Sequence, residues 1–437
     1  MGRVYLRDAE IAAVPEEREF KRARHEIVEV PRPPTATPLA SDVAEGLALL
    51  LFGFDSDPDD RERWFQQAFT FADSNSNAPW GLQQDFGGPC GVLAAVQAYL
   101  LRDMHLAAQQ GGAQLDLASQ QDPLTELSAY VDARPERLRG HLASALCDML
   151  VRCCSWTKPL LWAEVVTLDF IQVTEFPSPA ELHKFLESTS LSSPGSVLSF
   201  TCSLILTRGM ESVRGDMDNP GQPLVGAFGH CTQELVNLCL IGSAASNVFD
   251  GEIKFEDCGD DNSGDTISLK GVRAPCPVGY LTAMEALGLA EVGSYYKAPA
   301  YPIWVLGSSS HYTVLFGLGC AANHCALPSA TAATNTSNDA VRATSDGSAA
   351  CCAMCSKKPG CALAGAGTGA LYHYNGKVIG GDPVQVRRVA LAWDGETHPK
   401  PLLMHDGDSD AVFREAMRTR WPGAQVTWDG ESAPQIV

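Results

Sequence analysis

The amino-acid sequence predicts an α+β fold, on the basis of three observations. An apolar helical segment from Cys90 to Leu101 follows directly on a Gly-Gly-Pro turn. Two apolar strand segments, Pro302–Gly307 and His311–Gly317, are separated by only three serines, which is typical of neighbouring antiparallel strands. The chain has 437 residues, of which 45% are hydrophobic, so it is long enough to bury a large core.

The first 40 residues are charged and then rich in proline, a composition that predicts an arm or linker. We expect one domain over residues 41–437, with an insertion at about 320–370. In that insertion Ala, Ser, Thr and Gly dominate, cysteines accumulate and aromatic residues are absent. Such a composition is typical of a low-complexity segment rather than of a packed core.

Local patterns predict the other elements of the domain. Ser41 is the predicted N-cap of a helix whose apolar face carries Val43, Leu47, Leu50 and Leu51. The remaining elements, in chain order, are a charged loop at 55–63, a mostly helical region at 122–190 with one strand at 163–168, a strand at 197–200, a helix at 231–240 ended by Gly242, a polar surface loop at 256–275, a helix starting near Thr282, a strand at 371–374 and a compact tail at 420–428.

Charge and cysteine content restrict the partners and the compartment. The net charge is −20, which argues against nucleic acid because its binding needs clustered Lys and Arg. The N-terminus has no apolar signal region, and the longest apolar run, from Leu47 to Phe54, is too short to span a bilayer. Fifteen cysteines form no small secreted framework. We therefore expect mostly free thiols, no membrane partner and a cytoplasmic location, with the nucleus as a second site.

Cys90 is the strongest candidate for a catalytic residue. It lies where free backbone N–H groups and the positive end of a helix dipole gather. A thiol there is expected to be stabilised as thiolate, with a pKa that falls from ~8.5 to roughly 3.5–7.5. The alternative is that Cys90 is a small buried hydrophobic residue, the commonest role of a free cysteine.

A thiolate nucleophile needs a base, and His311 is the best placed histidine, at the start of a buried strand. Its alternative is a core-edge histidine bonded to a backbone carbonyl. The Gln84 amide and the Cys90 backbone N–H are the expected oxyanion donors, with the adjacent Gln83 as the competitor. Asn375 and Asp382 are candidates to orient the imidazole, and the sequence does not choose between them.

Two further clusters are weaker. In the insertion, Cys352 and Cys355 form a C-x-x-C pair that His324 and Cys325 can complete as a zinc site, but the spacing fits no common ligand pattern. The pair His230–Cys231 lies at a predicted helix N-terminus, where we expect it to be structural. We therefore predict no metal and no cofactor.

Several segments together resemble the MINDY deubiquitinases. They run, with gaps, from about residue 41 to the C-terminus, and they are Gly81–Gln84, Gly88–Ala98, Cys231–Leu238, Ser246–Phe249, Gly279–Thr282, Pro302–Val305, Ser310–Phe316 and Trp421–Ala424. The resemblance implies a papain-like cysteine isopeptidase that acts on ubiquitin and polyubiquitin chains, with a preference for the lysine linkage that marks proteins for the proteasome.

The resemblance also implies roles for three residues. Cys90 matches the nucleophile, His311 the base, and Gln84 the residue that shapes the oxyanion hole. The chain departs from the family at Asp85–Phe86 and in the insertion at about 320–370, and the Asp85 carboxylate would raise the Cys90 pKa if it pointed inward. Two other functions stay open: a thiol acyl-hydrolase for a different substrate, and a non-catalytic ubiquitin-binding module with an inert Cys90.

Overall fold

The computed structural model describes residues 35–437 except 75, 111–122, 133–135, 155–157, 257–265, 318–367, 378–384, 393–408, 431–432 and 435–437. Most of the predicted insertion, its zinc-ligand candidates and Asp382 therefore lie outside the described residues. Within the described ranges, no helix combines the length and the apolar character that crossing a membrane requires.

The structure is a mixture of helices and strands, which confirms the α+β class. The helices are α1 Ser41–Phe52, α2 Pro58–Gln66, α3 Cys90–Gln110, α4 Pro123–Asp132, α5 Glu136–Cys153, α6 Pro179–Ser188, α7 Ser196–Arg208, α8 Met210–Asp216, the short 3-10 helix η1 Ala227–Gly229, α9 Gln233–Ile241, α10 Ala283–Ala286, α11 Ser294–Lys297 and α13 Ser409–Arg418. The strands are β1 Thr37–Pro38, β2 Thr70–Phe71, β3 Leu82–Gln83, β4 Leu160–Thr167, β5 Phe170–Phe176, β6 Glu252–Glu256, β7 Thr266–Lys270, β8 Gly279–Thr282, β9 Ile303–Gly307, β10 Tyr312–Phe316, β11 Thr368–Asn375, β12 Gln385–Ala392 and β13 Gln425–Trp428.

A six-stranded sheet supports the predicted site. Its order is β13-β12-β11-β10-β9-β8, and all its neighbours are antiparallel except β8 and β9. Successive side chains of a strand point to opposite faces. Accordingly Val314 and Phe316 pack with α3 in one apolar cluster, and Leu315 packs with Phe413 of α13 in a second cluster. Both faces of the sheet are thus covered.

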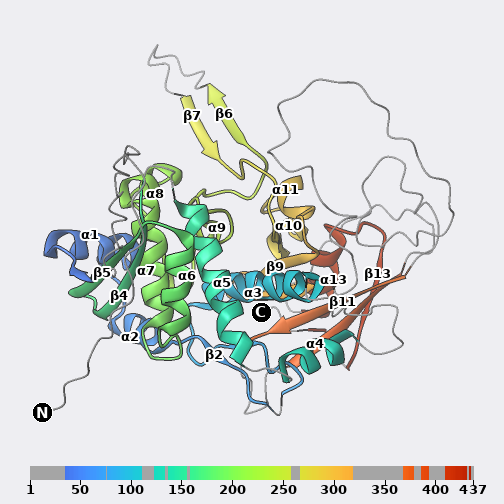
Figure 1. Ribbon diagram of the computed structural model, residues 1–437. Coiled ribbons are helices and arrows are strands. Elements are labelled where there is room, and N and C mark those ends of the chain that lie inside the picture. Colours follow the sequence, from blue (N-terminus) through green and yellow to red (C-terminus); the bar gives the residue numbers. More distant parts are fainter. Residues whose placement is uncertain are drawn as a thin grey trace, which may run out of the picture. The chain divides into compact units, whose positions relative to one another are not determined.

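Helix α3 is the central helix of the domain, and Figure 1 shows it between the green helices and the orange strands. It packs against β9 and β10 on one side and against α5 and α9 on the other. Its side chains from Val92 to Val96 are almost fully buried. A helix that is apolar on all sides is stable only when it is buried in this way, so its first residue has a fixed position relative to the sheet.

The segment 197–200, predicted to be a strand, lies instead in helix α7. Hydroxyl groups spaced four residues apart explain the difference, because they lie on one face of a helix. Ser199 accepts a hydrogen bond from the Val165 N–H at 3.0 Å, and Ser203 accepts one from the Ala163 N–H at 2.7 Å. The two serine hydroxyls of the helix therefore accept hydrogen bonds from backbone N–H groups at the edge of β4.

Other boundaries also differ from the predictions. Residues 58–63 of the predicted charged loop belong to α2, because Asp57 caps its N-terminus through the Asp59 N–H and Pro58 fits the first helical turn. Ala40 rather than Ser41 is the N-cap of α1. A hairpin of β6 and β7 occupies part of the predicted loop at 256–275, and β4 and β5 form a second hairpin within 122–190.

Several predictions are confirmed. Helix α9 begins after its N-cap Thr232 and ends at Gly242 in the left-handed conformation, and α10 begins after Thr282. Strands β9 and β10 pair antiparallel, as expected from their spacing. The N-terminal boundary differs slightly from residue 40, because β1 (Thr37–Pro38) pairs with β5.

Candidate active site

The turn before Cys90 is closely packed. Cys90 is the first residue of α3 and is 3% exposed. Gly88 has a φ of 125°, and a Cβ atom there would lie 2.9 Å from Trp64 Nε1 and 3.0 Å from the Gly229 oxygen. Trp64 Nε1 donates to that same oxygen at 2.8 Å. Only glycine fits a backbone that is both left-handed and this crowded.

The Cys90 sulfur is surrounded by backbone groups. Its thiol donates to the Gly88 oxygen at 3.7 Å. Burial raises the pKa of Cys90 to about 11, although hydrogen bonds from the N–H groups of Tyr312, Gly91 and Cys90 itself lower it. The expected thiolate with a depressed pKa is therefore wrong for this conformation, because the loss of water around the charged sulfur outweighs the helix N-terminus.

His311 lies immediately before β10, in a turn held by Ser308, whose hydroxyl accepts from the His311 N–H at 3.1 Å. Its Nε2 atom lies 2.9 Å from Asn375 Oδ1, which also accepts from the Lys377 N–H at 3.0 Å. Because that amide oxygen accepts, Nε2 carries the proton and Nδ1 keeps the lone pair that a base needs. Of the two candidates to orient the imidazole, the described residues contain Asn375 in this position.

The imidazole of His311 is buried, and burial lowers its pKa. Lys377 and His230 lower that pKa further through their charge, and the Asn375 hydrogen bond raises it. Lys377 also lowers the pKa of Cys90. One exposed ammonium group thus favours the ionised thiol and the neutral imidazole at the same time.

The structure brings the Cys90 and His311 segments together through the backbone. Helix α3 packs against β10, and the Tyr312 N–H, which lowers the pKa of the Cys90 thiol, belongs to the peptide bond between His311 and Tyr312. The first turn of α3 and the start of β10 are therefore in direct contact. Residues 221 positions apart in the sequence are thus brought together, Cys90 as the first residue of α3 and His311 in the turn that leads directly into β10.

Gln84 is also tied to the strand that carries Asn375. Its backbone N–H donates to the Gly376 oxygen at 2.7 Å, and its side chain is buried. Its Nε2 atom donates to the Phe86 oxygen at 2.8 Å, so in this conformation the amide is held by its own loop. The competitor Gln83 instead donates to the exposed Asp85 carboxylate at 2.7 Å.

Gln67 organises the loop before Cys90 and was not singled out by the sequence. It is fully buried, and its Oε1 accepts from the N–H groups of Asp85 and Phe86 at 3.0 and 3.1 Å. Its Nε2 donates to the Ala68 oxygen at 2.8 Å. The sequence around Gln67 gives no local sign of this role, because its partners are 18 and 19 residues away.

Cys231 lies beside the candidate nucleophile. Its thiol donates to the same Gly88 oxygen at 3.6 Å, and a Cβ atom on Gly91 would lie 3.1 Å from its sulfur. Burial raises the pKa of Cys231 far above its usual range, so it is a neutral thiol. His230 and Cys231, expected to be purely structural, thus adjoin the site. All eight cysteines in the described ranges are free.

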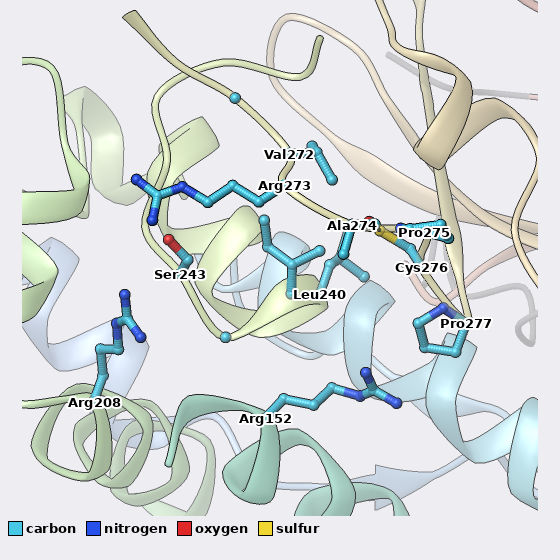
Figure 2. A pocket seen from close by; sticks show the side chains of 13 residues that line it. Arg152, Arg208, Leu240, Ser243, Val272, Arg273, Ala274, Pro275, Cys276 and Pro277 are labelled. Carbon is cyan, nitrogen blue, oxygen red and sulfur yellow. Dashed lines mark hydrogen bonds between the residues drawn. The ribbon is translucent and has the colours of Figure 1, made fainter. Parts of the chain in front are cut away.

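An arginine-lined cavity of about 240 Å³ lies elsewhere, between the ends of α5, α7 and α9 (Figure 2). Arg152 and Arg208 belong to the last turns of α5 and α7, where a cation offsets the negative end of the helix dipole. Arg208 is paired with Asp216 at 2.9 Å, and Arg152 lies 3.5 Å from Asp148. These arginines therefore serve the fold. In the part of the chain that the structure describes, no group of three acidic, His or Cys side chains is arranged to hold a metal.

Comparison with known proteins gives a consistent result. Residues 49–324 match the family model described as deubiquitinating enzyme MINDY-3/4, conserved domain. The chain is 34% identical over 297 residues to a Bos taurus protein named probable ubiquitin carboxyl-terminal hydrolase MINDY-4, covering 64% of this chain and 36% of that protein. It is 30% identical over 321 residues to the Homo sapiens ubiquitin carboxyl-terminal hydrolase MINDY-3, covering 63% and 65%.

The chain thus spans between about a third and two thirds of the length of the curated relatives it matches. No solved structure matches. The family model covers more than half of the chain, and the matched residues include Gln84, Cys90 and His311. This chain therefore belongs to the MINDY-3/4 family.

Proposed function

We propose that the chain is a papain-like cysteine isopeptidase that removes ubiquitin from ubiquitin chains. Cys90 is the nucleophile, His311 the base and Gln84 the oxyanion donor. The observation that carries this proposal is the packing of α3 against β10, with the peptide N–H of Tyr312 close enough to lower the pKa of the Cys90 thiol. A cysteine hydrolase needs its thiol and the imidazole of its base within reach of each other, and this packing supports such an arrangement.

The reaction begins from a neutral pair. Cys90 has a raised pKa and His311 a lowered one, so the resting site holds a thiol and a neutral imidazole rather than an ion pair. As the sulfur attacks the carbonyl carbon of the isopeptide bond, His311 Nδ1 takes the thiol proton. The negative charge that develops on the carbonyl oxygen is stabilised by the Cys90 N–H and the Gln84 amide, each contributing roughly 3–4 kcal/mol.

The second half of the reaction returns the proton. The C–N bond breaks as His311 gives its proton to the departing lysine amine, which leaves a thioester between Cys90 and the C-terminal glycine of ubiquitin. Water, deprotonated by His311, then hydrolyses the thioester and regenerates the thiol. For Gln84 to take part, its Nε2 must leave the Phe86 oxygen to which it now donates, so we propose that substrate displaces this loop bond.

The names of the relatives support ubiquitin chains as the substrate class. The preference for one lysine linkage is a further proposal. Relatives in the family are named ubiquitin carboxyl-terminal hydrolases, and we propose that this chain prefers the lysine linkage that marks proteins for the proteasome. We further propose that it acts in the cytoplasm, where the eight free cysteines of the described ranges stay reduced.

Ubiquitin tetramers of each defined linkage test the proposal when they are incubated with the wild-type chain and with Cys90→Ala. We expect selective cleavage of the proteasome-targeting linkage by the wild type and none by the variant, whose circular dichroism spectrum should be unchanged. Equal cleavage by the variant would exclude Cys90. Equal cleavage of all linkages would exclude the preference but not the activity.

A further inference from the structure

An open groove of about 670 Å³ lies beside the candidate active site, between the segment that joins α1 to α2 and the turn at η1. Its apolar floor includes Phe52, Pro223 and Val225, and its rim includes Phe54 and Phe228. We call it the Phe54–Phe228 groove. Nothing in the reaction described above uses these residues.

Both rim phenylalanines are in energetically unfavourable positions in the isolated chain. Phe54 is 85% exposed and Phe228 is 78% exposed, so each leaves a large apolar surface in water. Phe228 also has a φ of 59°, the one left-handed residue other than glycine in the described ranges. A strained backbone that displays an exposed aromatic ring is typical of a binding surface rather than of a core.

The charge of the groove indicates which kind of partner is complementary to it. The exposed carboxylates of Asp55 and Asp57 line it, whereas the third lining carboxylate, that of Asp60, is buried and paired with Arg63. Arg214 is the cation among the lining residues. A second copy of this chain would bring another strongly negative surface, since the net charge is −20. The complementary partner therefore has an apolar patch ringed by lysine and arginine side chains.

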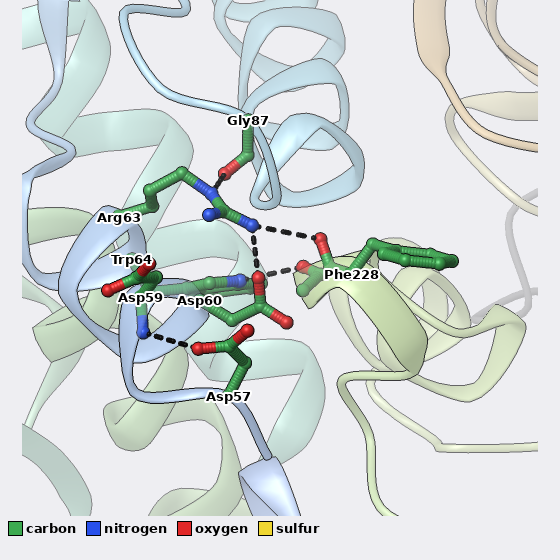
Figure 3. Close-up of polar contacts among 8 residues, drawn as sticks. Asp57, Asp59, Asp60, Arg63, Trp64, Gly87 and Phe228 are labelled. Atoms are coloured by element: carbon green, nitrogen blue, oxygen red, sulfur yellow. Dashed lines mark hydrogen bonds and ion pairs between the residues drawn. The ribbon is translucent and has the colours of Figure 1, made fainter.

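The groove is connected to the turn that carries the nucleophile. Figure 3 shows the Arg63 guanidinium between the Gly87 oxygen, the Phe228 oxygen and the Asp60 carboxylate. Arg63 donates to both carbonyl oxygens at 3.3 Å and forms an ion pair with Asp60. A partner seated on Phe228 would thus be held at a fixed position relative to residues 87–90.

We infer that the Phe54–Phe228 groove binds the ubiquitin unit whose C-terminal carbonyl is attacked, an inference that rests on the proposed function. Ubiquitin offers an apolar patch surrounded by basic side chains, which matches two exposed aromatic rings next to the exposed carboxylates of Asp55 and Asp57. Burying both rings on this partner recovers the apolar surface that the free chain leaves in water. The Arg63 contacts then align the ubiquitin tail with Cys90.

The test compares the second-order rate at which ubiquitin with a C-terminal alkyne modifies the wild type and four variants. Phe54→Ala and Phe228→Gly remove the rings, and glycine also suits the left-handed backbone, so this variant should fold at least as well. Asp55→Lys reverses an exposed charge. Leu289→Ala is the matched control, because Leu289 is 73% exposed and lies outside the groove.

We expect each groove variant to react about tenfold more slowly or worse, and Leu289→Ala to react like the wild type. Alkylation of Cys90 by iodoacetamide, which needs no groove, should keep its wild-type rate in all of them. Groove variants that react with the ubiquitin probe as fast as the wild type would overturn the inference and leave the proposed function standing. If the alkylation rate of the groove variants fell as much as their rate with the ubiquitin probe, the inference would also be overturned, because the loss would then come from a change in the 87–90 turn. A wild type that does not react with the probe would overturn the proposed function itself.

Discussion

His311 Nε2 lies 2.9 Å from Asn375 Oδ1, at the end of the sheet where β10 and β11 lie side by side. The Lys377 N–H holds that oxygen from the other side at 3.0 Å. The amide therefore fixes both the ring orientation and the tautomer of His311. In the proposed mechanism this residue positions the base rather than touching the substrate.

Replacing Asn375 should affect turnover more than binding. We expect Asn375→Ala to lower kcat by about 10-fold or more with little change in KM. An imidazole that is free to rotate loses part of the rate enhancement, about 10²–10⁴-fold, that a positioned base contributes. Asn375→Asp should raise the pKa of His311, since a carboxylate favours the imidazolium. The acid limb of the kcat/KM profile would then move to higher pH, whereas a residue with only a structural role would leave the profile in place.

Gln84 offers a test of the oxyanion site. Gln84→Ala should lower kcat by about 10²–10³-fold, the cost of one oxyanion donor, and leave KM within a few-fold. Gln83→Ala is the matched control, because its amide binds the exposed Asp85 carboxylate. Similar losses in both variants would show that the loop, rather than the Gln84 amide, limits the rate.

Alkylation of Cys90 should be slow at neutral pH. With a pKa of about 11, the thiolate fraction and hence the iodoacetamide rate should rise about tenfold per pH unit below that value. Lys377→Ala should move the curve to higher pH and Lys377→Arg should leave it in place, because the charge of Lys377 lowers the Cys90 pKa. Fast alkylation near pH 7 by the free chain would contradict the buried resting thiol. The measurement is peptide-resolved labelling followed by mass spectrometry.

Gly91 tests the packing of α3 against α9. Alanine is favoured over glycine in a helix by about 1 kcal/mol, but a Cβ atom on Gly91 would lie 2.7 Å from Val236 Cγ2 and 2.9 Å from Cys231 Cβ. Because overpacking costs about 1–3 kcal/mol, we expect Gly91→Ala to lower the free energy of unfolding.

Gly215 in α8 is the matched control for that substitution. A Cβ atom on Gly215 would meet no neighbouring group of the described residues within 4 Å, so space is not limiting there. Gly215→Ala should raise the free energy of unfolding by up to about 1 kcal/mol. Chemical denaturation of both variants gives the comparison, and a stabilised Gly91→Ala would contradict the close packing beside Cys90.

Much of the fold could be predicted because its signals are local. The Thr232 cap, the Gly242 end and the strands on either side of three serines lie within short windows, and each element was found. Helix α7 was missed because a largely apolar segment of four residues fits a strand or a helix equally well. The four-residue spacing of Ser199 and Ser203 was present in the sequence and favours the helix over the strand.

The site could be predicted in part for a similar reason. Cys90 is marked by its turn and helix, and Gln84 rather than Gln83 is the buried one because neighbouring residues near a strand point to opposite faces. The contact of Asn375 with His311 depends on the pairing of β10 with β11, which joins residues 64 positions apart. The raised pKa of Cys90 depends on burial by several distant segments, which no local pattern reports.

The most direct test of the central claim is to map where ubiquitin with a C-terminal alkyne attaches to the chain. We predict a single adduct on Cys90, identified by peptide mass spectrometry, and its loss in Cys90→Ala. Cys231 is an internal control, because its thiol shares the Gly88 oxygen with Cys90 and should stay unmodified. An adduct on Cys231, or none on the wild-type chain, would contradict the assignment of Cys90 as the nucleophile of a ubiquitin isopeptidase.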